Sequence, residues 1–232
     1  MFGTQAQKDK WLPGVASGEV VTSFALTEPE AGSDSASVRT RAERDGDHYV
    51  LNGSKRYITN AARASLFTVM ARTNPEAKGG AGVSAFLVPS DLKGVSVGKP
   101  EKKMGQQGAH IHDVNFDNVR VPAENRLGEE GQGFRVAMQV LDRGRLHISS
   151  VCVGVAERLI EESVRYAAER KQFGQPIANF QMIQAQLADC RAEANAGRAM
   201  VLEAARKRDR GENVVMDAAA AKRFELVGIG RQ

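Results

Sequence analysis

The stretch "SVRTRAERDGDHYVLNGSKRYIT", residues 37–59, alternates apolar and polar side chains in short runs. A period of two is typical of β-strands that bury one face. The pairs Asp45-Gly46 and Asn52-Gly53 interrupt the runs. Such pairs favour tight turns because Asn, Asp and Gly tolerate positive φ angles. The stretch therefore predicts three short strands joined by two hairpin turns.

More strands are expected on the C-terminal side of this stretch. Short apolar runs lie at 66–72, 83–89, 94–100 and 110–122, the last with a turn expected at Asp117-Asn118. Together with the first three strands they give roughly seven or eight strands in about 100 residues, enough for a small barrel or sandwich. We therefore predict an antiparallel β-barrel or sandwich domain.

Near Gly128 the spacing of apolar residues becomes helical. The apolar stripe consists of Phe134, Met138, Leu141, Ile148, Val151, Val155, Leu159 and Val164. It is longer than an average helix of about 11–12 residues, so we expect it to pack along a partner helix. Gly174 and Pro176 then break the pattern, and further helices are predicted from about 181 to 208 and from near Val214. The predicted fold class is α+β, with strands first and long antiparallel helices after them.

The first 18 residues fit neither part. Residues 5–12 predict one or two helical turns, which Pro13-Gly14 should stop because proline cannot continue the backbone hydrogen bonding of a helix. We predict three domains, namely residues 1–20 as a helical remnant, 21–128 as a β-domain and 129–232 as a partial helical domain.

Composition excludes several classes of protein. The net charge of +4 over 232 residues gives weak support for nucleic-acid binding, because that function usually needs a concentrated basic patch. The two cysteines, Cys152 and Cys190, both lie in helix-like segments, so we expect no disulfide framework and a reducing compartment. Neither an acid nor a cysteine completes a metal pattern around His110 and His112.

The sequence also shows no apolar run of the roughly 20 residues that span a bilayer, and no signal peptide. We therefore expect a protein that does not associate with membranes. Its expected location is cytoplasmic, or the mitochondrial matrix if the source is eukaryotic.

Four motifs occur in a fixed order, namely "FALTEPEAGSD", "YITNA", "DRGR" and "ERKQFGQPIANFQ". Each motif alone is modest evidence. The ordered set, with the change from strands to helices between the second and third, resembles the acyl-CoA dehydrogenase family of flavoproteins. That family has an N-terminal helical domain, a middle β-domain and a C-terminal four-helix domain. By this resemblance the chain is expected to be a fragment that holds the last turns of the first domain, the second domain and roughly half of an incomplete four-helix bundle.

The resemblance implies an FAD-dependent reaction that converts an acyl-CoA thioester to the trans-2-enoyl-CoA. A carboxylate takes the α-proton while the β-hydrogen leaves as hydride to flavin N5. One branch of the family carries its catalytic Glu at the position of Gly144, which has no side chain to act as a base. The resemblance therefore implies a base further downstream, no catalytic residue in this chain, and an inactive isolated chain.

The first motif is expected to face the flavin ring. Pro29 and Gly32 turn the chain away after a strand, which leaves room for the edge of a ligand. The flavin contacts of the family match Phe24, Leu26 and Thr27, with the Thr hydroxyl near N5, and Ser33 matches a position that touches acyl-CoA. The alternative is an ordinary Pro-Gly loop in which Glu28 and Glu30 are merely solvated.

The second motif places Tyr57 and Thr59 on one face of a strand and Ile58 on the other. By resemblance all three bind the flavin, with the Tyr57 ring on the dimethylbenzene region and the Thr59 hydroxyl bonded to a ring heteroatom. The family more often has Trp at the position of Tyr57. The alternative is an ordinary hairpin strand with a cross-strand aromatic pair.

The last two motifs lie in the helical part. Asp142 and Arg145 are three residues apart, hence on one side of a helix. They match positions that border the acyl-CoA channel, or alternatively form a local ion pair. Arg170, Phe173 and Gln181 match residues that serve the FAD of a neighbouring subunit, and the alternative is a loop with a basic C-cap.

The resemblance implies three partners for the full-length protein, namely an acyl-CoA substrate, an electron-transferring flavoprotein as acceptor, and further copies in a homotetramer or homodimer. An acyl-CoA oxidase or a flavin monooxygenase on the same scaffold is an alternative. A DNA-binding module of the superfamily is another, against which the mild charge counts. The length and branching of the acyl chain are not specified by the sequence.

Overall fold

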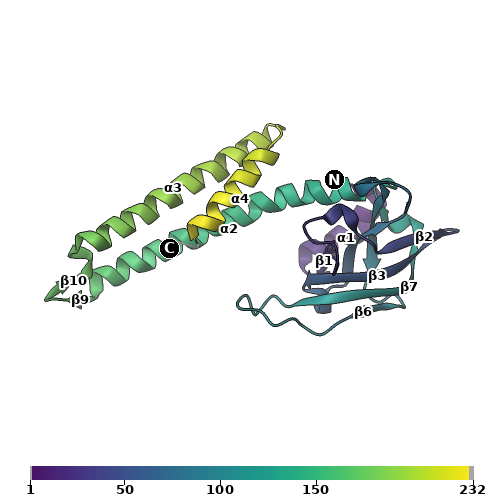
Figure 1. Cartoon of the computed structure of the whole chain (residues 1–232), viewed down its shortest axis with the longest axis horizontal. Helices are drawn as coiled ribbons and strands as arrows, with labels where there is room; N and C mark the ends of the chain where they lie inside the picture. The colour runs from purple at the N-terminus through teal and green to yellow at the C-terminus, as the bar shows by residue number, and fades with distance from the viewer. Residues whose placement is uncertain (1, 230–232) are drawn as a thin grey trace. The chain divides into compact units, whose positions relative to one another are not determined.

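The structure, a computed structural model, describes residues 2–229, with side chains described through residue 224. It divides into two compact units, Met1–Met138 and Gln139–Gln232. The first contains a β-sheet and the second a set of helices (Figure 1). The predicted α+β class is confirmed. The predicted domain boundaries stay a prediction.

The first unit is built on one eight-stranded sheet with the path β6-β7-β3-β2-β4-β5-β8, while β1 pairs with β4. The predicted total of seven or eight strands is therefore confirmed, although residues 37–59 form two strands and not the three expected. The strands are β1 (Thr22–Ala25), β2 (Arg41–Asp45), β3 (His48–Thr59), β4 (Leu66–Arg72), β5 (Val83–Pro89), β6 (Val95–Val97), β7 (Ile111–Pro122) and β8 (Arg126–Leu127).

The sheet is mixed rather than antiparallel throughout. β1 runs parallel to β4 over four residue pairs, and β2 meets β4 in parallel at Arg41 and Arg72. Within the described residues the strand path ends at β6 and β8 and does not close into a barrel. Alternating polarity shows that a strand has one buried face, but it carries no information about which neighbour the strand pairs with.

Of the three predicted turns, the one at Asp45-Gly46 is correct, and those at Asn52-Gly53 and Asp117-Asn118 are wrong because both pairs lie inside continuous strands. Gly46, with φ +61°, joins β2 to β3 as expected. Asn52-Gly53 instead lies inside the continuous strand β3, at a register shift opposite the predicted turn at Asn118 on β7. The Asn118 backbone N–H donates to the Asn52 side-chain oxygen over 2.8 Å. Asn and Gly suit a bulge for the same reason that they suit a turn, so composition could not separate the two.

Alternate residues of the central strands form the core of this unit, as the period of two predicts. Fully buried members of the core are Tyr49, Leu51, Phe67, Val69, Phe86, Val88, Val114 and Val119. The rings of Tyr49 and Phe86 lie 4.9 Å apart, centroid to centroid. This close packing fixes the strands that carry the site described below.

The first helix, α1 (Gln5–Ser17), is longer than predicted. Pro13 lies inside it and the helix ends at Gly18, which has φ +82°. The expectation of a stop at Pro13-Gly14 is therefore wrong. Thr4 and Gln7 form a capping box at the N-terminus, and the Gln7 amide also donates to the backbone oxygens of Glu124 and Arg126. These contacts tie the start of α1 to the end of the sheet.

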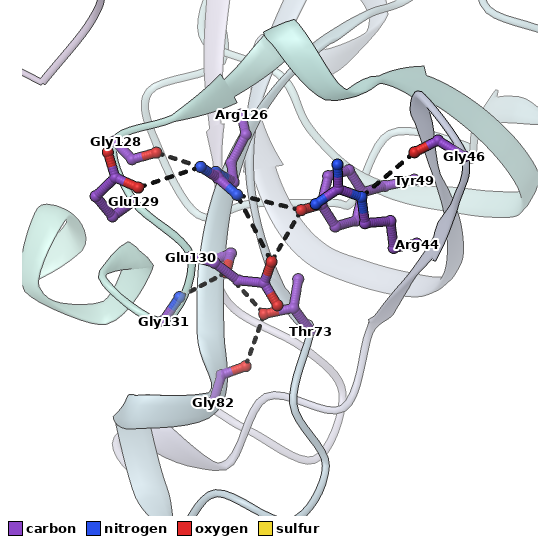
Figure 2. A network of polar contacts seen from close by, with 11 residues as sticks. Arg44, Gly46, Tyr49, Thr73, Gly82, Arg126, Gly128, Glu129, Glu130 and Gly131 are labelled. Carbon is purple, nitrogen blue, oxygen red and sulfur yellow. Dashed lines mark hydrogen bonds and ion pairs between the residues drawn. The ribbon is translucent and has the colours of Figure 1, made fainter.

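A polar network fixes the segment that leads from the sheet into helix α2 (Gly133–Glu169), as Figure 2 shows. The Tyr49 hydroxyl donates to Glu130 over 2.9 Å and accepts from Arg126 over 3.2 Å. The Gly131 N–H donates to the Ser84 hydroxyl over 2.9 Å. The acidic, glycine-rich segment before α2 is thereby bonded to β3 and β5.

Gly133 begins α2 directly against β5. A Cβ at this position would lie 2.3 Å from the Ser84 carbonyl carbon and 2.6 Å from the Ala85 nitrogen. Backbone atoms cannot move aside cheaply, so glycine is required here for close approach. Val136 and Ala137, one turn later, are buried against the sheet.

In the second unit, α3 (Gln181–Asp209) runs alongside α2, and the hairpin β9 (Lys171–Gln172)–β10 (Gln175–Pro176) joins them (Figure 1). The third helix, α4 (Val215–Ile229), packs against both. All three predicted helices and the break at Gly174 and Pro176 are confirmed. No helix among the described residues is long and apolar enough to span a lipid bilayer.

The helix α2 has two apolar faces, and the predicted stripe is not the face that packs on α3 and α4. The packed face consists of Leu146, Val153, Ala156 and Ile160. Phe134 and Met138 of the stripe pack in the first unit. The six other stripe residues are between 36% and 59% exposed: Leu141, Ile148, Val151, Val155, Leu159 and Val164. For these six, the expectation that they pack along a partner helix is wrong within the described residues.

We expect Gly133→Ala to lower the free energy of unfolding of the first unit by about 1–3 kcal/mol, because the new methyl group overlaps the backbone of β5. Gly144→Ala in the same helix is the matched control. No atom lies within 4 Å of a Cβ built there, so a gain of up to about 1 kcal/mol in helix propensity is expected. Urea denaturation followed by circular dichroism measures both. Equal midpoints for the two variants would contradict the close approach.

We further expect the chain to self-associate as its concentration rises, because the six exposed stripe residues form an apolar surface. The double variant Val151→Gln/Leu159→Gln should weaken association by at least about tenfold, since each buried side chain contributes roughly 1.5–3 kcal/mol. Sedimentation velocity measures this, with the exposed Glu161→Gln on the same helix as control. A wild-type chain that stays monomeric at all concentrations would disprove the expectation.

Candidate functional site

The segment after β1 lies directly beside the C-terminal part of β3. The Ser23 hydroxyl donates to the Thr59 backbone oxygen over 2.6 Å, and the Arg56 N–H donates to the Thr27 backbone oxygen over 2.8 Å. The two segments predicted to face a flavin, far apart in sequence, are thus brought together. Leu26 is buried at this junction, whereas Thr27 is partly exposed.

A β-bulge gives Tyr57 its exposed position. The pairing of β3 with β7 shifts between Lys55 and Ile58, and Tyr57 has φ +59°. A left-handed conformation is costly for an aromatic residue. The bulge turns Tyr57 outward, so that its side chain is 52% exposed, and places the Arg56 guanidinium 5.0 Å from the centre of its ring. Bulges next to binding sites commonly redirect a side chain in this way.

The neighbours of Tyr57 follow the predicted alternation. Thr59 is exposed, and Ile58 is 2% exposed in the core. A ligand on this surface would reach the side chains of Tyr57 and Thr59, but Ile58 could contact it through backbone atoms alone. Phe24, on the adjacent strand β1, is partly buried and packs against the Leu26 cluster.

A buried ion pair that sequence reasoning missed lies beneath this surface. The Lys55 ammonium donates to the Glu28 carboxylate over 2.7 Å and to the Leu26 backbone oxygen over 3.0 Å. The exposed fractions of the two charged side chains are 0% for Lys55 and 5% for Glu28. Lys55 lies at an alternate position of β3 that faces the same side as the buried Tyr49 and Leu51. This alternation could have indicated that Lys55 is buried. The sequence offered no way to identify its partner.

Glu28 also closes the loop that follows it. Its carboxylate accepts the backbone N–H groups of Arg39 over 2.5 Å and Thr40 over 2.9 Å. The alternative in which both acids of the loop are solvated is therefore wrong for Glu28, while Glu30 is exposed and paired with Arg39. Since both oxygens of Glu28 are engaged, this carboxylate is poorly suited to act as a catalytic base.

The electrostatics of the pair reflect two opposing effects. Burial lowers the pKa of Lys55 to about 8, although the charge and hydrogen bond of Glu28 act to raise it. Burial alone would raise the pKa of Glu28, but the Lys55 charge, together with hydrogen bonds from Arg39, Lys55 and Thr40, lowers it below the usual 4.5. Both groups are mainly charged near pH 7.

Ser33, the predicted acyl-CoA contact, lies exposed in the loop that Glu28 closes. An isolated bridge between Glu28 and Ala31 shapes the start of this loop, and the 3₁₀ turn Ser35–Ser37 shapes its end. The same pair, Glu28 and Lys55, therefore holds both the loop that contains Ser33 and the bend at Leu26 and Thr27.

In the second unit, the three predicted residues of the last motif gather at the hairpin between α2 and α3. Arg170 is exposed, and its backbone oxygen accepts the Ile177 N–H over 2.8 Å. Phe173, with φ +53°, is 92% exposed, and its ring lies 6.0 Å from that of Phe180. Gln181 is the exposed first residue of α3. An aromatic side chain as exposed as Phe173 is unusual unless a ligand or partner covers it.

Asp142 and Arg145 form the ion pair that their spacing allows, with 2.5 Å between the carboxylate and the guanidinium. Both side chains are partly buried on α2. The structure therefore contains the local ion pair that was expected as the alternative. A role for Asp142 and Arg145 in binding acyl-CoA stays a prediction.

The two adjacent segments of the first unit thus carry types of side chain that suit a flat heteroaromatic ligand. Tyr57 supplies a ring, Thr27 and Thr59 supply hydroxyl groups, and Phe24 supplies apolar area. Among the described residues, no group of three or more His, Cys, Asp and Glu side chains could hold a metal ion.

Two family models match the chain. Residues 23–119 match the acyl-CoA dehydrogenase middle domain, and residues 131–225 match the acyl-CoA dehydrogenase C-terminal domain. An acyl-CoA dehydrogenase of Bacillus subtilis is 44% identical over 96% of this chain and 59% of its own length. The structure of butyryl-CoA dehydrogenase from Megasphaera elsdenii superposes with a TM-score of 0.94 at 41% identity, covering 98% of this chain and 59% of that chain.

A solved structure described as PigA with FAD and proline is also similar, with a TM-score of 0.95, 32% identity, and coverage of 98% of this chain and 59% of that chain. Taken with the sheet, the helices and the two adjacent motifs, these matches define a flavoprotein fold of the acyl-CoA dehydrogenase type. The chain belongs to the acyl-CoA dehydrogenase family. It spans about 59% of the length of the Bacillus subtilis relative.

We expect Glu28→Gln to destabilise the first unit by about 3 kcal/mol at pH 7, because it leaves the Lys55 ammonium buried without a counter-charge. The pKa of Glu28 is lowered in the folded state, so its contribution is present above pH 4.5 and is lost as the pH falls through the folded pKa. The difference between wild type and variant should therefore shrink below pH 4.5. Hydrogen exchange of the β1 and β3 amides measures the difference in stability between wild type and variant. A difference that does not change with pH would contradict the ion pair between Lys55 and Glu28.

Proposed function

We propose that this chain supplies the flavin-facing part of an FAD-dependent acyl-CoA dehydrogenase. The reaction would be the α,β-dehydrogenation of an acyl-CoA thioester to the trans-2-enoyl-CoA. The observation that carries the proposal is the contact between the bend at Leu26-Thr27 and the strand that ends in Tyr57 and Thr59. Family membership supports the same reading.

The proposed roles follow from the chemistry of the side chains. When bound, FAD would accept the hydride that leaves the β-carbon of the substrate. Thr27 would donate a hydrogen bond at the edge of the flavin ring near N5, and Thr59 would bond a ring heteroatom. Tyr57 would pack on the dimethylbenzene end, with Arg56 on its ring. Phe24, Leu26 and Ile58 would complete the contacts through apolar and backbone atoms.

The second unit would serve a different part of the cofactor. Arg170 presents a fork of donors that suits a pyrophosphate. Phe173 would cover an aromatic edge, and Gln181 would add a hydrogen bond. We propose that these residues act on the FAD of a neighbouring subunit in a homodimer or homotetramer, which would explain why they are exposed in a single chain.

Substrate contacts are proposed at Ser33 on its loop and at Asp142 and Arg145 on α2. By the resemblance, the catalytic base is a Glu of the C-terminal helical domain of the family, and we assign that role to no residue of this chain. An electron-transferring flavoprotein is the proposed acceptor.

A second candidate is an oxidase or monooxygenase on the same scaffold. The similar structure described as PigA with FAD and proline supports this second candidate, because the ligand named beside its flavin is an amino acid. The two functions separate by assay with oxygen as the sole acceptor, in a protein extended to the length of its curated relatives. Peroxide formed at the rate of dye reduction would favour the oxidase.

We expect the isolated chain to bind FAD weakly but saturably, and Thr27→Ala to weaken binding about fivefold. The loss corresponds to one hydrogen bond of about 1 kcal/mol. Thr22→Ala removes an exposed hydroxyl from the start of the same strand and should leave binding unchanged. Quenching of flavin fluorescence measures the affinity. Equal losses in both variants, or no binding by wild type, would count against the proposed function.

A further inference from the structure

We propose that Lys55 and Glu28 are positioning residues of the flavin and acyl-CoA site, which hold the Thr27 bend, the Tyr57 bulge and the Ser33 loop in one fixed arrangement. The inference rests on the proposed function, because it assigns a purpose to a buried pair that lies beneath the proposed contacts. Neither residue is exposed to a ligand, so each would act through its neighbours.

The first contact concerns the bend. The Lys55 ammonium donates to the Leu26 backbone oxygen over 3.0 Å, one residue before Thr27. Lys55 itself is two residues before Tyr57, at the first position of the register shift. One side chain therefore connects the bulge on β3 to the bend after β1, and this sets the distance between Thr27 and Tyr57.

The second contact concerns the loop. The Glu28 carboxylate accepts the N–H groups of Arg39 and Thr40, at the far end of the loop that contains Ser33. Its own backbone begins that loop. Glu28 thus closes the loop at both ends while its charge is balanced by Lys55. Loss of the carboxylate would leave two backbone donors without an acceptor and free the loop to move.

A stabilising role alone does not account for a charged pair at this place. Desolvation of two buried charges largely cancels their attraction, so an apolar replacement of similar volume is often as stable. Hydrogen bonds with defined donors and acceptors fix geometry more closely than apolar packing does. Four such bonds involve the pair: one joins Lys55 to Glu28, one goes to the Leu26 backbone oxygen, and two come from the neighbouring N–H groups of Arg39 and Thr40.

The pair also gives the site a dependence on pH. The groups that face the Lys55 ammonium are the Leu26 carbonyl and the Glu28 carboxylate. On the neighbouring strand β7, the residue paired with Lys55 is the apolar Val114. Glu28 is the ionisable group that acts on the ammonium. Because the pKa of Lys55 is lowered to about 8, deprotonation above that pH would remove its charge and loosen the bend. FAD affinity should fall as the pH rises from 7 to 9.

The test uses the full chain with Lys55→Met, Glu28→Gln and the double variant. Gln keeps one acceptor for the loop, and Met keeps the volume of Lys without its charge. The double variant should be at least as stable as either single variant in urea, since it buries no unpaired charge. If the pair has a positioning role, the double variant should still bind FAD about tenfold more weakly than wild type, without the fall in affinity between pH 7 and 9.

A second measurement needs no cofactor. Hydrogen exchange of the Arg39 and Thr40 amides should be at least about tenfold faster in the double variant than in wild type. Lys93→Met, which removes an exposed lysine after β5, is the control and should change neither readout. The two measurements together separate a positioning role from a purely structural one.

The outcomes are distinct. Wild-type affinity and wild-type exchange in the double variant would overturn the inference while leaving the proposed function intact. A wild-type chain that binds no FAD would overturn the proposed function. The positioning role of the pair would be overturned with it, whereas exchange at Arg39 and Thr40 would still show whether the pair holds the loop closed.

Discussion

The first unit depends on the burial of one ion pair, between Lys55 on β3 and Glu28 after β1. An isolated charge in the interior costs several kcal/mol, so each of the two groups requires the other. Their hydrogen bonds bring together the end of β1, the middle of β3 and the far end of the loop closed at Arg39 and Thr40. The surface proposed to bind the flavin lies over this arrangement.

Two irregularities of the sheet shape that surface. The bulge at Asn52 and Gly53 shifts the pairing of β3 with β7, and the second shift, between Lys55 and Ile58, turns Tyr57 outward with a positive φ angle. Between them Lys55 faces the interior, on the same parity as the buried Tyr49 and Leu51. Local departures from ideal geometry at a binding surface are expected when function requires a particular side-chain direction.

The helical unit shows a related conflict between pattern and environment. α2 has apolar residues on two faces, and α3 and α4 cover the face formed by Leu146, Val153, Ala156 and Ile160. The more regular stripe, including Val151 and Leu159, stays exposed. Exposed apolar side chains that line one face of a helix commonly mark a surface that a partner covers. Periodicity identified the helix correctly but could not say which face its neighbours would cover.

The sequence by itself determined the α+β class, the number of strands, the three long helices and the family, because these follow from local periodicity and from ordered motifs. It also placed Phe24, Thr27, Tyr57 and Thr59 in segments that prove to be neighbours. The tertiary structure alone decided the parallel pairing of β1 with β4, the two bulges, and the partnership of Lys55 with Glu28. These features depend on contacts between residues far apart in the chain, and the pattern of a single segment does not encode which distant partner it will meet.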